Sequence, residues 1–373
     1  MGLHPHSLPD FPWDSLTPYL ERASVHPDGI VNLSVGTPVD PTPQVVKDAL
    51  MAAADAPGYP TTHGTTALRE TVVEWFERRR GVAGLNAADV LPTMGSKELV
   101  ALLPGLLGLG EGDIVVHPTA AYPTYDVGAR LAGATALPAD AVADWAGNTQ
   151  VKLVWVNSPS NPTGAVASAE YLAEVVRAAR AIGAVVASDE CYAELAWAEP
   201  WVTDGVPSIL DPRVSGGHND SLLAVYSLSK QSNLAGYRAA FAAGDSRVIA
   251  GLLETRKHAG MIVPAPVQAA MVAALGNDAH VEAQKQIYGA RRAQLIDAVK
   301  GAGFGVEHSE AGLYLWATRG ETCWQTLKFL ADLGIVAAPG AFYGEAAKNH
   351  VRIALTATDE RISAACGRFV KAR

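Results

Sequence analysis

Short apolar runs alternate with longer helix-like segments between Val90 and Ala243, and this alternation restricts the possible folds more than any other feature. The runs have the length of buried strands, and segments such as Ala167–Ala181 have the pattern of helices. The apolar runs are Val90–Thr93, Ile114–His117, Leu153–Val156, Val185–Ala187, Leu222–Tyr226 and Ala239–Ala243. Strands that alternate with helices form a mostly parallel sheet with helices on both faces. The sequence therefore predicts an α/β fold.

A second pattern begins after Pro266, where helices come first and short strands follow. The predicted elements are helices at Gln268–Leu275, Val281–Ala302 and Trp324–Leu333, and strands at Tyr314–Trp316, Ile335–Ala337 and Val351–Leu355. The chain has 373 residues, 49% of them hydrophobic, which exceeds the usual size of a single core. We therefore expect a smaller α/β domain after a seam near Val263–Pro266.

The composition argues against several classes of partner. The net charge is −9, and Lys and Arg form no run that could follow a nucleic acid backbone. The least polar stretches, Leu99–Gly110 and Ala259–Gly276, are broken by prolines and are unsuited to crossing a bilayer. No secretory signal is visible at the N-terminus, so we expect a cytoplasmic protein. The cysteines, Cys191, Cys323 and Cys366, have neither a disulfide nor a zinc spacing, and no metal is expected.

Polar segments follow the predicted strands one after another. They are Gly95-Ser96-Lys97, Tyr122-Pro123, Asn161-Pro162-Thr163-Gly164, Asp189-Glu190-Cys191-Tyr192 and Ser227-Leu228-Ser229-Lys230. Parallel strands bring such segments to one edge of the sheet, and open α/β folds bind their ligands there. We therefore expect these distant segments to meet in one pocket.

Lys230 and Asp189 are the residues with the most specific chemistry. A lysine at the end of an apolar run has a reason to be there if its amine forms an imine with an aldehyde, as pyridoxal phosphate requires. A carboxylate is what the pyridine nitrogen of the same cofactor needs, because the charged ring acts as an electron sink. Taken alone, each residue is more simply a polar group at the surface of the sheet edge.

Three further side chains suit the ring of such a cofactor. Tyr192 and Asn161 could bond its ring oxygen, and Tyr122 could stack on its face. The common alternatives are a half-buried tyrosine for Tyr192, a turn signal for Asn161, and a core position for Tyr122.

Anion-binding groups accompany them. Ser96 and Lys97 begin a predicted helix, whose N–H groups attract a phosphate, while Ser227 adds a hydroxyl and Arg238 a guanidinium. Arg352 offers a planar fork that fits a substrate carboxylate, although strand alternation could equally point it to solvent.

Taken together, these segments resemble the class I and II aminotransferases of the pyridoxal phosphate fold type I. The resemblance runs from Leu33-Ser34-Val35-Gly36-Thr37-Pro38 to Val351-Arg352, and includes Tyr59-Pro60 and Gly64. It implies a large domain at residues 38–265 with a mostly parallel seven-stranded sheet between helices. Residues 1–37 and 266–373 would form the small domain.

The resemblance also implies a role for each residue. Lys230 would hold pyridoxal phosphate and move the substrate proton, Asp189 would pair with the ring nitrogen, and Tyr122 would stack. Asn161 and Tyr192 would bond the ring oxygen. Four residues, Ser96, Lys97, Ser227 and Arg238, would hold the phosphate. Gly36, Asn161 and Arg352 would grip the α-carboxylate. Tyr59 would reach the partner's phosphate in a homodimer with shared active sites.

The opening Leu8-Pro9-Asp10-Phe11-Pro12-Trp13-Asp14 and the segment His258–Pro266 look like actinobacterial N-succinyldiaminopimelate aminotransferases. This implies amino transfer between N-succinyl-LL-2,6-diaminopimelate and 2-oxoglutarate or glutamate, in lysine biosynthesis. The alternatives are an aminotransferase for aspartate, alanine or aromatic amino acids, and a C–S β-lyase on the same cofactor. A regulatory module without catalysis is disfavoured because the residues before Gly36 are too few for a helix-turn-helix.

Overall fold

The apolar runs of residues 90–243 form the strands of one seven-stranded sheet in the computed structural model, which describes residues 8–372. The strands are β2 (Val90–Met94), β3 (Ile114–His117), β4 (Thr135–Pro138), β5 (Val151–Asn157), β6 (Val185–Asp189), β7 (Leu222–Ser227) and β8 (Ala239–Gly244). Their order is β2-β8-β7-β6-β5-β3-β4. All pairings are parallel except those of β8 with β2 and β7. The predicted, mostly parallel sheet is confirmed.

The reversed direction of β8 matters for the site. Because β8 is antiparallel to β7, Ala240 at its beginning pairs with Ser227 at the end of β7. Arg238, which directly precedes β8, therefore lies at the same sheet edge as the ends of the parallel strands.

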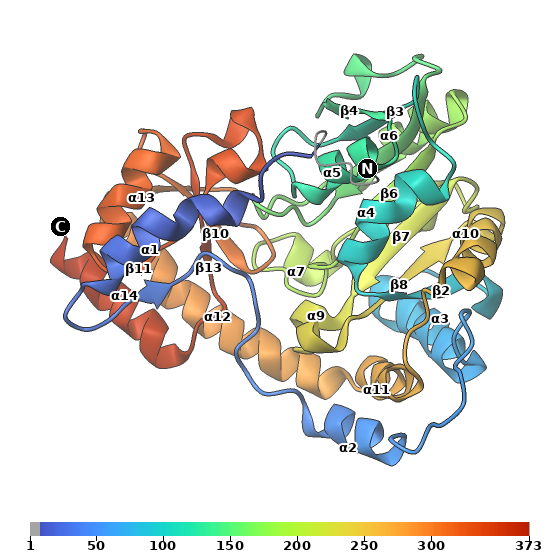
Figure 1. Ribbon diagram of the computed structural model, residues 1–373, viewed down its shortest axis with the longest axis horizontal. Helices are drawn as coiled ribbons and strands as arrows, with labels where there is room; N and C mark the ends of the chain where they lie inside the picture. The colour runs from blue at the N-terminus through green and yellow to red at the C-terminus, as the bar shows by residue number, and fades with distance from the viewer. Residues whose placement is uncertain (1–7, 373) are drawn as a thin grey trace, which may run out of the picture.

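Helices cover both faces of this sheet (Figure 1). One face packs under α4 (Ser96–Leu106), α5 (Thr124–Leu131) and α10 (Ser246–Ala259). The other packs under α3 (Thr66–Arg80), α6 (Ala169–Ala181) and α11 (Ala265–Leu275), with α2 (Gln44–Ala52) against α11. Three short helices, α7 (Trp201–Asp204), α8 (Pro212–Ser215) and α9 (Leu228–Gln231), lie in the connections. The buried strands are apolar on both sides because both faces are covered.

A second body lies beside the sheet domain in Figure 1 and has its own core. A four-stranded antiparallel sheet has the order β12-β13-β10-β9, and a parallel pair joins β1 to β11. The strands are β1 (Val31–Asn32), β9 (Gly305–Glu307), β10 (Tyr314–Thr318), β11 (Ile335–Val336), β12 (Ala338–Pro339) and β13 (Val351–Ala354). The helices are α1 (Thr17–Ser24), α12 (Asp278–Gly301), α13 (Cys323–Asp332) and α14 (Asp359–Lys371). The N-terminal segment thus packs with the C-terminal one, through β1 on β11 and α1 on α13.

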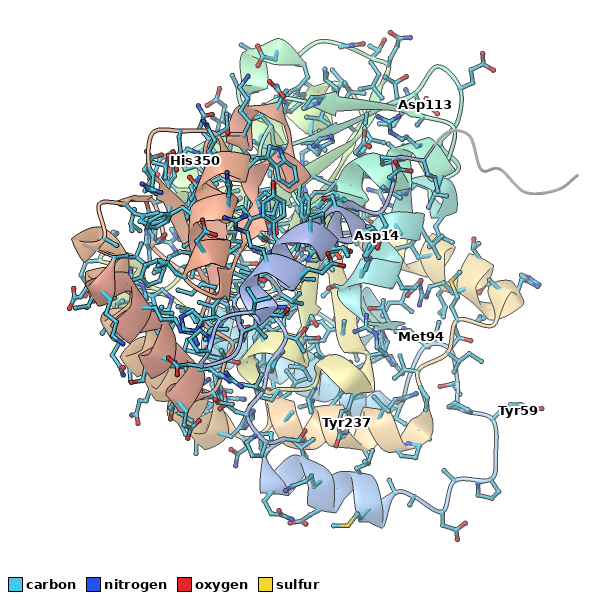
Figure 2. The ribbon with its side chains drawn as sticks, turned by 60° about the vertical axis from the view of Figure 1, so that its left-hand side comes forward. Asp14, Tyr59, Met94, Asp113, Tyr237 and His350 are labelled. Carbon is cyan, nitrogen blue, oxygen red and sulfur yellow. The ribbon has the colours of Figure 1, made fainter. Side chains whose placement is uncertain are left out.

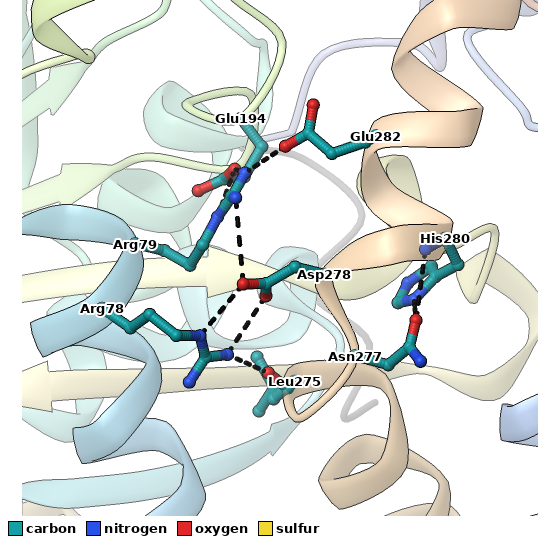
Figure 3. A network of polar contacts seen from close by, with 8 residues as sticks. All are labelled: Arg78, Arg79, Glu194, Leu275, Asn277, Asp278, His280 and Glu282. Atoms are coloured by element: carbon teal, nitrogen blue, oxygen red, sulfur yellow. Dashed lines mark hydrogen bonds and ion pairs between the residues drawn. The ribbon is translucent and has the colours of Figure 1, made fainter.

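Charged residues tie the beginning of α12 to the large domain (Figure 3). Arg78 on α3 bonds Asp278 at 3.0 Å, and its neighbour Arg79 bonds Glu282 at 2.9 Å and also contacts Glu194. The network fixes the position from which α12 extends into the second body (Figure 1).

No helix of residues 8–372 combines the length and the apolar character that a membrane span requires. Among the His, Cys, Asp and Glu side chains of the same residues, no three are grouped so that they could hold a metal ion.

Candidate active site

A cavity of about 530 Å³ lies at the edge of the large sheet where the parallel strands end. Its wall comes from both bodies of the molecule. It includes Gly36, Ser96, Lys97, Tyr122, Asn161, Asp189, Tyr192, Ser227, Lys230, Arg238 and Arg352. The structure thus brings together all the residues singled out in the sequence except Tyr59.

Lys230 enters the cavity from a tight turn. β7 ends at Ser227, whose hydroxyl accepts the N–H of Ser229 at 3.2 Å and so caps the short helix α9. The turn sends the Lys230 amine across the cavity, where Nζ donates to the carbonyl oxygen of Gly36. The amine of the large domain is therefore in direct contact with the N-terminal segment.

Asp189 is a buried carboxylate at the end of β6. It accepts hydrogen bonds from the Tyr125 hydroxyl at 3.0 Å and from the Cys191 N–H at 3.2 Å. Burial raises the pKa of Asp189 above its usual range, although these donors and the Lys230 charge act the other way. Within residues 8–372 it forms no ion pair. A buried carboxylate in this state gains most from a cationic ligand, such as a protonated pyridine ring.

The phosphate-binding features converge at the beginning of α4. Gly95 precedes the helix with a φ of 80°, and no side chain caps the helix N–H groups. A Cβ at Gly95 would lie 2.1 Å from a guanidinium nitrogen of Arg238, so only glycine leaves room for that side chain. Arg238 itself has a φ of 55°, which is uncommon for a residue other than glycine. An uncapped helix N-terminus beside a guanidinium forms a cradle for a phosphate.

Arg352 approaches from the small domain and is buried, not solvent-facing as an isolated strand arginine could be. Its Nη1 donates to Asn161 Oδ1 at 2.7 Å and its Nη2 to the Ser34 carbonyl at 2.9 Å. Asn161 is held in turn by its N–H, which donates to Asn157 Oδ1 at 2.7 Å. The arrangement presents a fixed guanidinium to the cavity.

Tyr314 and Tyr125 are two cavity residues that the sequence did not single out. The Tyr314 hydroxyl lies 3.0 Å from the Tyr192 hydroxyl, and its ring lies under Arg352 at 3.9 Å. Tyr314 is two residues before Trp316, which pairs with Arg352 across β10 and β13, so strand alternation places Tyr314 and Arg352 on one face. That pairing could have indicated Tyr314, whereas Tyr125 has the pattern of an ordinary core residue.

Lys97 and Tyr122 lie at the mouth of the cavity. The Lys97 ammonium is 5.8 Å from the ring centres of both Tyr122 and Phe11, and Phe11 belongs to the N-terminal segment. Tyr122 meets Tyr125 edge to face at 6.1 Å. Lys97 forms no ion pair with any residue between 8 and 372, so an anion can approach it.

Tyr59 lies outside the cavity of its own chain. Its side chain is fully exposed and points away from the molecule on a loop after α2 (Figure 2). In this position it can reach only another molecule.

These features fit pyridoxal phosphate. The cradle at Gly95 and Arg238 suits its phosphate, Asp189 suits its ring nitrogen, and Lys230 suits its aldehyde. Fold and site together define a pyridoxal phosphate enzyme of fold type I.

The comparisons with known proteins give the family. Residues 28–369 match the family described as aminotransferase class I and II. The chain is 59% identical over 362 residues to the 4-dedimethylamino-4-oxo-anhydrotetracycline transaminase OxyQ of Streptomyces rimosus, covering 97% of this chain and 99% of the relative. It is 34% identical to the LL-diaminopimelate aminotransferase of Gloeobacter violaceus, covering 95% and 96%.

Among solved structures, an aminotransferase from Neisseria meningitidis superposes with a TM-score of 0.87 at 28% identity, covering 98% of each chain. The chain therefore belongs to the class I and II aminotransferases, and its cofactor is pyridoxal phosphate.

Proposed function

We propose that the protein transfers the amino group between glutamate and a long 2-oxo acid that carries a second carboxylate, the keto form of an N-succinyl-diaminopimelate type of amino acid. The main observation that supports this substrate is Lys97, a cation at the cavity wall between two aromatic rings. It has no ion-pair partner among residues 8–372. A distal carboxylate of the substrate would complete this site. The diaminopimelate relative supports an acceptor of this length.

A second cavity supplies room for the substrate body. It measures about 800 Å³ and shares Phe11 and Tyr122 with the first, so the two cavities adjoin at these rings, which lie 5.8 Å from the Lys97 ammonium. Its wall carries Asp10, Asp14, Asp126 and Glu345. The same wall also carries Arg130, which is paired with Asp126 at 2.7 Å, so an anion is better placed beside Lys97 than among these carboxylates.

The α-carboxylate of the substrate binds at Arg352. The guanidinium already donates to Asn161 Oδ1, which leaves the amide NH₂ of Asn161 free to donate to the ring oxygen of the cofactor. Arg352 and Asn161 therefore set the angle between substrate and cofactor. The backbone of Gly36, next to the Lys230 amine, closes this side.

Lys230 moves the proton. When bound, pyridoxal phosphate supplies the electron sink for the electron pair that the substrate's α-carbon keeps on losing its proton. Nζ of Lys230 would take that proton from the α-carbon and would be the group that moves it between the substrate and the cofactor. Asp189 keeps the ring nitrogen positive, and Tyr122 lies at the cavity wall where it can cover the ring.

The active form is proposed to be a homodimer. Tyr59 is exposed on a projecting loop, and Val35, Val39, Val45 and Met51 in the same N-terminal region are also exposed. Burial of this surface against a second copy would carry Tyr59 to the partner's phosphate cradle. The cytoplasmic location expected from the sequence stays a prediction.

A second candidate acceptor is a bulky cyclic ketone. The 59% identity to a transaminase named for an anhydrotetracycline favours it, and the adjoining 800 Å³ cavity could hold a large ring system. In that case the aromatic rings of Phe11 and Tyr122, and not the charge of Lys97, would select the substrate.

The test is a screen of amino donors on the cofactor-loaded protein. Glutamate and N-succinyl-diaminopimelate are each added alone, and conversion of the bound cofactor to its amine form is followed by absorbance. Lys97→Gln is expected to lower kcat/KM for the succinylated substrate about tenfold to 100-fold. The kcat/KM for alanine, which has no distal carboxylate, should stay at the wild-type value. Equal loss for both substrates would reject the distal role of Lys97. Release of pyruvate from cysteine-type substrates, with no response to glutamate, would indicate the C–S lyase instead.

A further inference from the structure

Tyr314 lies where the two halves of the proposed site meet. Its side chain is buried on β10, and its hydroxyl is 3.0 Å from that of Tyr192, the residue proposed to bond the cofactor's ring oxygen. Its ring faces the Arg352 guanidinium at 3.9 Å, a cation–π contact. One side chain thus contacts both a cofactor-binding and a substrate-binding residue.

The lack of a side chain at Gly36 leaves the space that the Tyr314 ring and hydroxyl occupy. A Cβ on Gly36 would lie 2.1 Å from the Tyr314 hydroxyl oxygen and 2.7 Å from its ring. The main chain that receives the Lys230 amine therefore touches Tyr314 directly. Any side chain at residue 36 would displace the Tyr314 hydroxyl from Tyr192.

The two hydroxyls differ in acidity. Burial raises the pKa of Tyr192 well above its usual value. Burial acts on Tyr314 too, but the charges of Arg352 and Lys230 outweigh it and lower the Tyr314 pKa. The hydrogen bond between the two hydroxyls holds the Tyr192 oxygen in place on the cavity wall.

The ionisable groups around Tyr314 come from several elements. They are Tyr192 and Cys191 after β6, Lys230 on α9, Tyr288 on α12, Tyr343 before β13, and Arg352 on β13. The two cations in this set and the hydrogen bond with Tyr192 favour a negative charge on the Tyr314 oxygen, whereas Cys191 disfavours it.

We propose that Tyr314 is a positioning residue: its hydroxyl hydrogen-bonds the Tyr192 hydroxyl and so holds it toward the cofactor's ring oxygen, while its ring packs against Arg352. The inference rests on the proposed roles of Tyr192 and Arg352. The two parts of the side chain do different work, so they can be separated by substitution.

Tyr314→Phe removes the hydroxyl and keeps the ring. The bond from Tyr192 stabilises the negative charge of the cofactor's ring oxygen most after the proton on the adjacent nitrogen, which joins Lys230 to the cofactor, has left. A weaker bond from Tyr192 therefore makes that proton harder to remove. The pH midpoint of the visible absorbance of the loaded protein should therefore rise by about half a unit to one unit. The KM for glutamate should change less than about twofold. Tyr314→Leu, which also removes the ring, should raise that KM roughly tenfold.

Tyr343→Phe is the matched control. Its hydroxyl is also buried in this region but has no hydrogen-bond partner among residues 8–372. The midpoint should stay at the wild-type value in this variant. A second readout needs no cofactor: in the unloaded protein, near-ultraviolet difference absorbance should show one tyrosine that ionises early in wild type and in Tyr343→Phe, and is missing in Tyr314→Phe.

The outcomes distinguish this inference from the proposed function. If wild type forms no visible band with pyridoxal phosphate, the proposed function fails. If it does form the band, and Tyr314→Phe has the same midpoint and the same tyrosine ionisation as wild type, the positioning role of Tyr314 is wrong. Equal shifts in Tyr314→Phe and Tyr343→Phe would also reject it.

Discussion

The two walls of the cavity are built in different ways. The cofactor wall comes from the carboxyl edge of one sheet, where β6 and β7 end in Asp189 and Ser227 and Lys230 follows within one turn. The substrate wall comes from chain segments far apart in sequence, represented by Gly36, Tyr314 and Arg352. One wall is fixed by a sheet, and the other by contacts between separate segments.

This difference separates chemistry from specificity. The sheet edge cannot shift without breaking main-chain ladders, which suits groups that must meet one cofactor with fixed geometry. The substrate wall depends on side-chain bonds, such as those of Arg352 to Asn161 and Ser34, and so can vary between relatives with different substrates. Substitutions on the two walls should therefore give different signatures.

The largest effect is expected at the centre of the cofactor wall. Lys230→Ala removes the amine that is proposed to hold the cofactor and move the proton, so turnover should fall by about 10⁴-fold or more. The visible absorbance that wild type shows with pyridoxal phosphate should disappear. Turnover with glutamate measures the first effect, and the equilibrium absorbance spectrum measures the second. An unchanged spectrum would show that the aldehyde is not bound at Lys230.

Asp189→Asn should have the next largest effect. The neutral amide cannot keep the ring nitrogen positive, and turnover should fall roughly 10²- to 10³-fold. Without cofactor the effect on stability is the opposite of the effect on turnover. Because burial raises the Asp189 pKa, the folded wild-type protein loses stability as pH rises from the unfolded-state pKa of aspartate to that raised value. The unloaded Asn variant should therefore be at least as stable as wild type at neutral pH. Thermal unfolding with and without cofactor would show this crossing, and a variant less stable in both states would contradict it.

The cofactor wall could be predicted from the sequence because each of its residues follows an apolar run. Strand ends such as Asp189 and Ser227 were visible as polar breaks, and parallel pairing alone brings them together. The edge strand β4 was not assigned, since Thr135 and Pro138 are exposed and it lacks an apolar run.

The substrate wall could be predicted only in part. Gly36 came from the family resemblance, and Arg352 was weighed as a carboxylate ligand against a solvent-facing strand residue. Strand alternation could have placed Tyr314 on the face of Arg352, but nothing local indicated its contact with Gly36. That contact depends on how β10, β13 and the N-terminal segment pack, which no periodicity records. Tyr125 was missed for a related reason, because it is fully buried and its bond to Asp189 joins α5 to β6.

Arg352→Lys tests the substrate wall alone. Lysine keeps the charge but cannot bond Asn161 and Ser34 while it presents a planar fork to a carboxylate. The KM for every amino donor should rise about tenfold to 100-fold. The affinity for pyridoxal phosphate, measured by titrating the unloaded protein, should change less than about threefold. Parallel losses in both would mean that the two walls are not separable.

The smallest effect on catalysis is expected where α12 holds the substrate wall from behind. Arg291 on α12 binds Asp40 through two bonds of 2.6 and 2.7 Å, and Asp40 lies only a few residues after Gly36 in the sequence. Arg291 also binds Asp359 at 2.7 Å, so Asp40→Asn leaves it a partner. The variant should raise the KM for glutamate by about twofold to fivefold and leave cofactor affinity unchanged.

The same pair gives a pH dependence with a definite sign. Burial alone would raise the Asp40 pKa, but the bonds from Arg291 and Gln284 outweigh it and lower the pKa. A carboxylate with a lowered pKa stabilises the fold above the unfolded-state value, and this contribution is lost as pH falls through the folded-state value. Wild type should therefore lose more stability than Asp40→Asn between neutral and acidic pH in thermal unfolding. Identical pH curves would show that the α12 contact does not hold the substrate wall, and the contrast between the two walls would then rest on Arg352 alone.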